Sequence, residues 1–253
     1  MDILYVIGQG SRWQDNELRY SLRSLCKYGR NVGRIFIAGY LPVFINPESV
    51  TYIKCRDEYK AKHHNILRCI EKAVETAPIS SEFLYSSDDH FYIKETDFDH
   101  YPYYLRPGED KLLPSRYEKD EKHNSYRSSL ISTHQLLSSH NLPVYRFSWH
   151  GNTHFNRKLF NAPLMKQMRR ESYGYEYGCE PTCMMLNYQY SVKPFDITLR
   201  SDLKFQTLRS DKEGFMDRIG DRECFSIGDG SLGKYPIEVL QKLFPHPSRY
   251  ERF

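Results

Sequence analysis

Two adjacent carboxylates, Asp88 and Asp89, are the residues of this sequence best placed to do chemistry. They directly follow the apolar segment 82–87, EFLYSS. Neighbouring carboxylates repel each other unless a cation or hydrogen bonds compensate their charge. A divalent ion held by these oxygens could also bind a diphosphate and stabilise the charge of a leaving phosphate. The pattern therefore predicts a metal-assisted transfer at this turn, and a solvated acidic turn is the alternative interpretation.

Three histidines could add ligands to such an ion. His90 lies two residues after Asp88, which is the spacing of an Asp-x-Asp element. Further along, the segment 148–154, SWHGNTH, contributes His150 and His154 at the end of another apolar stretch. Each imidazole could instead be a structural histidine, so the residues alone leave the choice open.

A glycine-containing loop offers a place for an anion. The segment 8–13, GQGSRW, separates an apolar run from a helical pattern. The N-terminus of a helix binds phosphate through free N–H groups, and an arginine can pair with anionic oxygens. We therefore expect Gly8, Gly10 and Arg12 to contribute to nucleotide binding, although a Gly-x-Gly element alone is a weak signal.

A second candidate anion site lies at the start of the next helical pattern, where basic and amide side chains cluster. Lys62 and Asn65 belong to this cluster, KHHN at 62–65. The helix dipole and the side-chain donors both favour an anion there. We expect these two side chains to contribute to binding of the nucleotide, and a solvated helix start is the alternative.

A candidate general base is Glu180, in the segment YGCEPTC at 177–183. It follows a glycine-containing turn, where a carboxylate could reach the site and accept a proton from an acceptor hydroxyl. The alternative is an acidic residue at a helix start, stabilised by the dipole. The sequence does not support a hydrolase with a serine nucleophile or a kinase. It contains neither a Gly-x-Ser-x-Gly motif nor a phosphate-binding loop of the Walker type.

Strands and helices must alternate to position these residues. Apolar runs that predict strands are followed in turn by segments with helical spacing of apolar residues. Such alternation predicts a mainly parallel sheet with its ligand crevice at the carboxyl ends of the strands. The predicted strands are 2–7, 34–39, 50–54 and 82–87, and the predicted helices run from Asp15 or Asn16 to Gly29 and over 62–77.

Beyond residue 95 the periodicity weakens, and the expected elements are less regular. The chain shows no internal repeat and no low-complexity linker, so a single domain is the simplest interpretation. The expected elements are helices around 124–139 and near 181–190, a basic helical stretch over 157–170, strands near 144–149 and at 223–227, and a closing helix at 236–243.

Composition narrows the class of protein. With 40% hydrophobic and 27% charged residues, the chain lies outside the disordered and collagen-like classes. A net charge of +4 on 36 basic and 32 acidic residues does not indicate nucleic-acid binding. The absence of a run of about 18 apolar residues, and of the features of a signal peptide, predicts no membrane span and a cytoplasmic protein. Six cysteines spread singly along the chain suit a reducing compartment.

Several segments together resemble a known family. GSRWQDNELRYSLRSLCKYG (10–29), RIFIAG (34–39) and FLYSSDDHF (83–91) resemble the Stealth-type sugar-phosphate transferases. They equally resemble bacterial and phage-borne glycosyltransferases with the GT-A nucleotide-diphospho-sugar fold. More loosely, SWHGNTHFNRKLF (148–160) is similar to a later segment of the family, and LFPHPSRYE (243–251) is similar to the tail of phage-type members.

The resemblance implies an α/β fold of the GT-A class, with a mainly parallel sheet flanked by helices. It divides the single domain 1–253 into a nucleotide-sugar-binding half, 1–95, and an acceptor-side half with a C-terminal extension, 96–253. It also implies a donor such as a UDP-sugar, with Mn²⁺ or Mg²⁺ between its diphosphate and the Asp88–Asp89 pair. The similar later segment favours His150 over His154 as a ligand.

We therefore expect a metal-dependent glycosyltransferase that moves a sugar, in particular a hexosyl group, to a glycan or another hydroxyl acceptor. Asp89 and Glu180 are the candidate catalytic residues. Gln9 stands where the Stealth pattern has an aspartate, and the acceptor-loop string of that family is missing. Transfer of sugar 1-phosphate and binding without catalysis are the alternatives.

Overall fold

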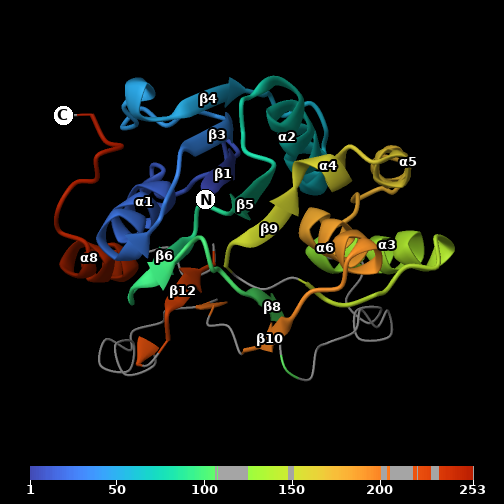
Figure 1. Cartoon of the computed structure of the whole chain (residues 1–253). Coiled ribbons are helices and arrows are strands. Elements are labelled where there is room, and N and C mark those ends of the chain that lie inside the picture. The colour runs from blue at the N-terminus through green and yellow to red at the C-terminus, as the bar shows by residue number, and fades with distance from the viewer. Residues whose placement is uncertain are drawn as a thin grey trace.

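The central element of the fold is a five-stranded sheet in the order β4-β3-β1-β5-β9 (Figure 1). The computed structural model describes residues 1–105, 107, 125–147, 151–200, 204–205, 219–220, 222–228 and 234–252. In the sheet, β4, β3, β1 and β5 run parallel and β9 runs antiparallel to β5. The strands are β1 (Asp2–Ile7), β3 (Ile35–Gly39), β4 (Thr51–Lys54), β5 (Glu82–Ser86) and β9 (Thr153–Asn156).

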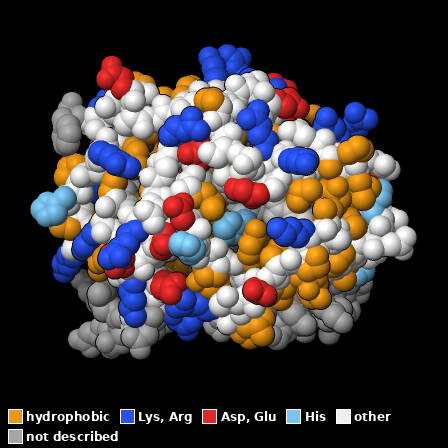
Figure 2. Space-filling view, viewed as in Figure 1, with side chains coloured by type: hydrophobic (Ala, Val, Ile, Leu, Met, Phe, Trp, Pro, Cys, Tyr) orange, Lys and Arg blue, Asp and Glu red, His pale blue; other side chains and the backbone are white. Residues whose placement is uncertain are grey.

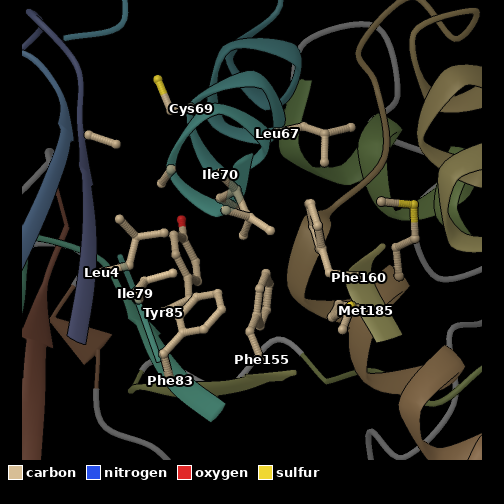
Figure 3. Packing of buried hydrophobic residues seen from close by; sticks show 14 of the residues in the cluster. Leu4, Leu67, Cys69, Ile70, Ile79, Phe83, Tyr85, Phe155, Phe160 and Met185 are labelled. Carbon is tan, nitrogen blue, oxygen red and sulfur yellow. The ribbon is translucent and has the colours of Figure 1, made fainter. Parts of the chain in front are cut away.

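Helices cover both faces of this sheet. On one face α2 (Lys62–Thr76) packs its Leu67 and Ile70 into a buried cluster with Phe83 of β5 and Phe155 of β9 (Figure 3). On the other face α1 (Asn16–Tyr28) contributes Leu18, Leu22 and Leu25 to a second cluster with residues of β1 and β3. Each such side chain contributes about 1.5–3 kcal/mol by leaving water. The mainly parallel, helix-flanked α/β fold expected from the sequence is therefore confirmed.

Smaller elements surround this core. Three of them form a sheet in the order β11-β12-β6, while β10 pairs with β8 and β2 pairs with β7. They are β2 (Gly29–Arg30), β6 (His90–Tyr92), β7 (Thr96–Asp97), β8 (Tyr103–Leu105), β10 (Ile197–Leu199), β11 (Lys204–Phe205) and β12 (Cys224–Ile227), with the 3₁₀ helix η1 (Pro47–Ser49). The other helices are α3 (Ser125–Ser139), α4 (Arg157–Phe160), α5 (Pro163–Ser172), α6 (Pro181–Val192) and α8 (Lys234–Leu243).

The carboxyl end of β3 comes close to that of β1, and this contact requires glycine. Gly39 has a φ of +111°, and a Cβ built on it would lie 2.1 Å from the carbonyl oxygen of Ile7. No side chain larger than hydrogen fits there. The two strand ends can therefore approach each other closely at the edge of the sheet where a ligand crevice was expected.

Two predicted elements differ from the structure. The basic helix expected over 157–170 is divided into α4 and α5, because Pro163 lacks an N–H and begins a new helix at its first position. The strand expected near 144–149 is absent from its described part, 144–147. There Tyr145 forms only an isolated β-bridge, and the side-chain amide of Asn187 binds both of its backbone groups, at 2.8 Å from its N and 2.7 Å from its O.

The C-terminal segment returns to the first half of the chain. Glu251 bridges to Ile45, and the backbone N–H of Arg252 donates to the carbonyl oxygen of Phe44. In the described part of the chain, no helix is both long enough and apolar enough to serve as a transmembrane span.

Candidate functional site

The acidic pair lies where the sequence analysis placed it. Asp88 and Asp89 form the turn that follows β5, at the carboxyl end of a strand paired with β1. His90 begins β6 directly after them and is 4% exposed. Its Nε2 lies 3.6 Å from Oδ1 of Asp89. The structure thus brings together both carboxylates and the first of the three histidines.

The Asp88 carboxyl group is held in a setting unfavourable to its charge. Burial, together with the neighbouring charges of Asp89 and Glu17, raises the pKa of Asp88 to about 7, and Lys62 acts in the opposite direction. For a carboxylate that is partly desolvated beside two like charges, the nearby cation of Lys62 compensates the charge only in part. This is the electrostatic state expected of a site that a divalent ion or a cationic group would complete.

Glu17 belongs to this site, although sequence reasoning missed it. It lies in the first turn of α1 and is 8% exposed. Ser11 Oγ donates a hydrogen bond to its Oε2 at 2.8 Å, and the same Oγ accepts from the backbone N–H groups of Trp13 and Asp15. Glu17 therefore fixes the loop between β1 and α1 as well as acting on Asp88. Its one sequence signal is an acidic residue in the first turn of a helix that follows the glycine loop.

The glycines of that loop leave open space. Gly8, Gly10 and Arg12 are exposed. A Cβ built on Gly10 meets no atom within 4 Å, and one on Gly8 would lie 3.8 Å from Asp57 Oδ2. Packing in the free protein therefore does not require either glycine, and the close approach of a ligand to the loop is sterically possible. Their role in nucleotide binding stays a prediction.

The two candidates at the start of α2 have different surroundings. The ammonium group of Lys62 is close enough to Asp88 to lower its pKa. The amide of Asn65 is used within the preceding loop: its Oδ1 accepts from the N–H groups of Glu58 and Tyr59, and its Nδ2 donates to Tyr59 O at 2.7 Å. The charge of Lys62 thus acts on the acidic turn, whereas Asn65 shapes the loop after β4.

Glu180 lies just before α6 and caps its N-terminus. Its Oε2 accepts hydrogen bonds from the backbone N–H of Cys183, at 2.7 Å, and from the hydroxyl of Thr182. Burial raises the pKa of Glu180. Its charge also acts on the buried hydroxyl of Tyr85, as do those of Asp88 and Asp89. Glu180 therefore combines the role of a helix cap with a position near the acidic turn, and its role as a base stays a prediction.

Of the two later histidines, the structure describes only His154. His150 lies outside the described residues. His154 is part of β9, its Nε2 contacts the carbonyl oxygen of Tyr101, and its ring stacks on Tyr103 at 4.2 Å between centroids. Burial lowers the pKa of His154, so the ring is neutral and donates to that carbonyl. The surroundings of His154 are those of a structural histidine.

A further polar side chain lies near the same edge of the sheet. Asn152 immediately precedes Thr153, which pairs with Tyr85 of β5, so it is close to the strand end that leads into Asp88. Asn152 is 5% exposed, and neither its Oδ1 nor its Nδ2 has a hydrogen-bond partner. The sequence signal that could have found it is its place two residues after His150, at the start of a strand.

The donor set at the acidic turn fits a hard divalent ion bound in part by a substrate. Within the described ranges, no three His, Cys, Asp or Glu side chains are grouped so that they could hold a metal ion. Mg²⁺ is commonly held by one or two carboxylates together with substrate phosphates and water. Asp88 and Asp89 supply such carboxylates, and their unfavourable electrostatics match this requirement.

One face of the molecule is mixed in character. Acidic and histidine side chains lie near one another around the middle of the face, with basic side chains around them, and hydrophobic side chains gather toward one side (Figure 2).

Comparisons with known proteins give a likeness in structure only. No protein-family model matches this sequence, and no curated protein matches it. A crystal structure of the galactosyltransferase LgtC, in complex with donor and acceptor sugar analogs, matches with a TM-score of 0.50 and 11% identity over 97% of this chain and 95% of that chain. This similarity, together with the mainly parallel sheet, decides the fold class. The chain has a GT-A-like fold.

Two other solved structures are similar to a smaller degree. An active-site mutant of LgtC matches with a TM-score of 0.48 and 11% identity, over 96% of this chain and 95% of that chain. Mouse xyloside xylosyltransferase 1, in its apo form, matches with a TM-score of 0.43 and 9% identity, over 92% of this chain and all of that chain.

Proposed function

We propose that this protein is a glycosyltransferase that moves a sugar, in particular a hexosyl group, from a nucleotide-sugar donor of the UDP type to a hydroxyl acceptor, with Mn²⁺ or Mg²⁺ as cofactor. The observation that carries the proposal is the electrostatics of the acidic turn. At the end of β5, the charges of Asp89 and Glu17 raise the pKa of Asp88, and the charge of Lys62, at the start of α2, lowers it. A nucleoside diphosphate together with a divalent cation would complete this arrangement of charges.

Each element of the site has a role in this proposal. Asp88 and Asp89 would hold the ion, which supplies charge compensation for the leaving diphosphate. Lys62 and Arg12 would contact the phosphates, and the open loop at Gly8 and Gly10 would admit the nucleotide. The GT-A-like fold supports the proposal, because it places these groups at the carboxyl ends of parallel strands, where ligands of open α/β sheets bind.

Glu180 is the proposed general base for the acceptor hydroxyl. A pKa raised by burial suits proton transfer near neutral pH, because the driving force and the fraction in the basic form are then balanced. Its cap bonds with Thr182 and Cys183 fix the carboxyl group in one orientation. The transfer would then proceed with inversion at the anomeric carbon.

Product analysis tests the proposal and separates it from the alternatives. The purified protein is incubated with UDP-glucose, UDP-galactose and their N-acetyl derivatives, with Mn²⁺ or with EDTA, and the nucleotides released are measured by chromatography. UDP released only in the presence of metal supports glycosyl transfer. UMP would instead indicate transfer of sugar 1-phosphate, and release of neither nucleotide together with donor binding would indicate a binding protein. A cytoplasmic location remains a prediction of the sequence alone.

A further inference from the structure

Two of the six cysteines, which are spread singly along the sequence, are brought together by the fold. Cys55 directly follows β4, and Cys69 lies in the middle of α2. Both are free and buried, at 6% and 2% exposed, and both belong to the buried cluster that α2 forms with the sheet. Their thiol groups are in hydrogen-bond contact with each other. The fold therefore creates a pair of thiols that no spacing motif in the sequence indicates.

Side chains of α2 hold the chain on both sides of Cys55. Lys72 donates from its Nζ to Lys54 O at 2.7 Å. Arg68 donates from its Nη1 to Arg56 O, also at 2.7 Å. These two hydrogen bonds fix the residue before Cys55 and the residue after it against the turn of α2 that carries the second cysteine. The contact between the two sulfurs is therefore imposed by the folded backbone.

The two sulfurs have different surroundings. Arg68 Nη1 also donates to Sγ of Cys55 at 3.7 Å, so a negative charge formed on this sulfur would lie beside a guanidinium group. The exposed loop 56–60 begins at the next residue. Burial, the contact with Cys55 and the charge of Asp57 raise the pKa of the Cys69 thiol, which lies at the edge of the cluster, away from the aromatic rings (Figure 3). Because the thiolate is the nucleophilic form, Cys55 is the better placed of the two to react first.

We propose that Cys55 and Cys69 form a dithiol that reacts with hydrogen peroxide and closes to a disulfide between the end of β4 and α2. The Cys55 thiolate attacks one peroxide oxygen, the O–O bond breaks, and a water leaves with the proton lost from the thiol, so that a sulfenic acid remains. Cys69 then attacks the Cys55 sulfur, the S–O bond breaks, and a second water leaves with the proton of Cys69. Two thiols are thereby oxidised to one disulfide, and one peroxide is reduced to two waters.

The disulfide restrains a part of the chain that borders the candidate site. It closes a ring over 55–69, which contains Lys62, the residue whose charge acts on Asp88. The ring also contains Asp57, whose Oδ2 lies 3.8 Å from the position of a Cβ built on Gly8. In a reducing compartment, disulfides are typically transient and serve redox sensing. The inference does not depend on the proposed function, because it concerns only the thiols and the segment between them.

Mass spectrometry after peroxide treatment tests the inference. The folded, reduced protein is treated with hydrogen peroxide, the remaining thiols are alkylated with N-ethylmaleimide, and the protein is digested. A peptide pair linked through Cys55 and Cys69 should form in the wild type and equally in the control Cys26→Ala, which lacks an exposed cysteine. Absence of the linked pair from the folded wild type, or its formation only after unfolding in urea, would overturn the proposal.

Single variants identify the sulfur that reacts first. Cys69→Ala lacks the second thiol, so Cys55 should retain oxygen and gain about 16 or 32 Da under the same treatment. In Cys55→Ala, the Cys69 thiol should remain reduced. Oxygen on Cys69 instead, equally on both sulfurs, or on neither would contradict the assigned order of attack.

Melting and hydrogen exchange measure the restraint in the wild type alone, so this test does not depend on the folding of a variant. Closing a ring of 15 residues lowers the entropy of the unfolded chain, and the oxidised protein should melt about 6–12 °C higher than the reduced one. The amides of 56–61 should exchange more slowly in the oxidised protein, and dithiothreitol should reverse both changes. An oxidised protein that contains the linked pair but shows neither change would refute the restraint.

Discussion

Among single residues, the acidic turn is notable because carboxylates from two distant parts of the sequence act together there. Asp88 and Asp89 are adjacent in the chain, but the third carboxylate, Glu17, which acts on Asp88, comes from α1. The charge repulsion among the three is relieved in part by Lys62. Because these groups lie at the edge of the sheet rather than in its core, substitutions there should change ligand binding more than folding.

The substitution Asp89→Asn tests the metal role of the turn. It removes one charged ligand oxygen while keeping the shape of the side chain, so we expect metal-dependent binding of UDP to be lost. Isothermal calorimetry with UDP and Mn²⁺ measures this, and the exposed Asp196→Asn is the matched control. The melting temperature should change little in both variants. An Asp89→Asn protein that binds UDP and Mn²⁺ with wild-type affinity would remove this turn from the proposed site.

The substitution Glu180→Gln tests the proposed base. Glutamine keeps a side-chain oxygen that can accept from Cys183 N, so the start of α6 should be preserved. A lost general base lowers turnover by about 10²-fold or more. Turnover and UDP affinity are measured together, and affinity should stay near that of the wild type. Turnover within a factor of a few of the wild type would leave Glu180 as a helix cap only.

At the scale of elements, the start of α2 joins the site to the core. The charge of Lys62 lowers the pKa of Asp88, while the next residue, His63, is 7% exposed and its Nε2 lies 3.3 Å from Ser129 Oγ of α3. Burial, together with the nearby charges of Lys62 and His64, lowers the pKa of His63 to about 4. The first turn of α2 therefore places one cation at the site and a neutral imidazole in the interior.

The buried His63 predicts how stability depends on pH. Its pKa is about 4 in the folded protein and near the ordinary value of 6.5 in the unfolded chain, so between these values the unfolded chain binds more protons. The free energy of unfolding should fall as the pH drops from about 6.5 toward 4 and lose on the order of 3 kcal/mol from this group. Below the folded-state pKa, this contribution levels off.

Urea denaturation at several pH values checks this expectation. The comparison is between the wild type, His63→Gln and the exposed control His246→Gln. His63→Gln should lose part of the pH dependence between about 6.5 and 4, since glutamine does not titrate, and His246→Gln should retain it. Equal pH dependence in the wild type and both variants would show that His63 does not titrate differently in the two states.

At the scale of the whole molecule, the C-terminal segment is joined to α1 by a buried ion pair. Arg23 donates from Nε and Nη2 to the two carboxylate oxygens of Glu251, at 2.8 and 2.7 Å. The side chains are 12% and 6% exposed. The segment also contacts the loop after β3 through Ile45 and Phe44. This contact connects the end of the chain to elements near the carboxyl edge of the sheet.

Breaking this ion pair should destabilise the protein. Arg23→Met removes both charged hydrogen bonds of the buried Glu251, which keeps its hydrogen bonds from Ser248 and its contact with Arg19 Nε at 4.0 Å, and we expect a cost on the order of 3 kcal/mol. The exposed pair Arg30–Glu95 provides the control, because Arg30→Met at an exposed pair should cost less than about 1 kcal/mol. Chemical denaturation of both variants gives the two values. A similar loss for both would mean that burial of the Arg23–Glu251 pair contributes nothing extra.

Local patterns in the sequence were enough to predict most of the helices and strands in the first half of the chain. The strands over 2–7, 34–39, 50–54 and 82–87 and the two helices between them agree with the structure to within one or two residues. They were predictable because apolar spacing of two or 3.6 residues is a local property. The acidic turn was predictable for the same reason, since it directly follows a strand in the chain.

The tertiary structure alone decided which polar side chains act together. Glu17 and Asp88 lie far apart in the sequence, the amide of Asn65 is used in its own loop, and the side-chain amide of Asn152 has no hydrogen-bond partner. Pairings of this kind depend on strand order, on register and on the direction of each side chain. Those quantities arise only when distant segments pack together, so no local pattern in the sequence specifies them.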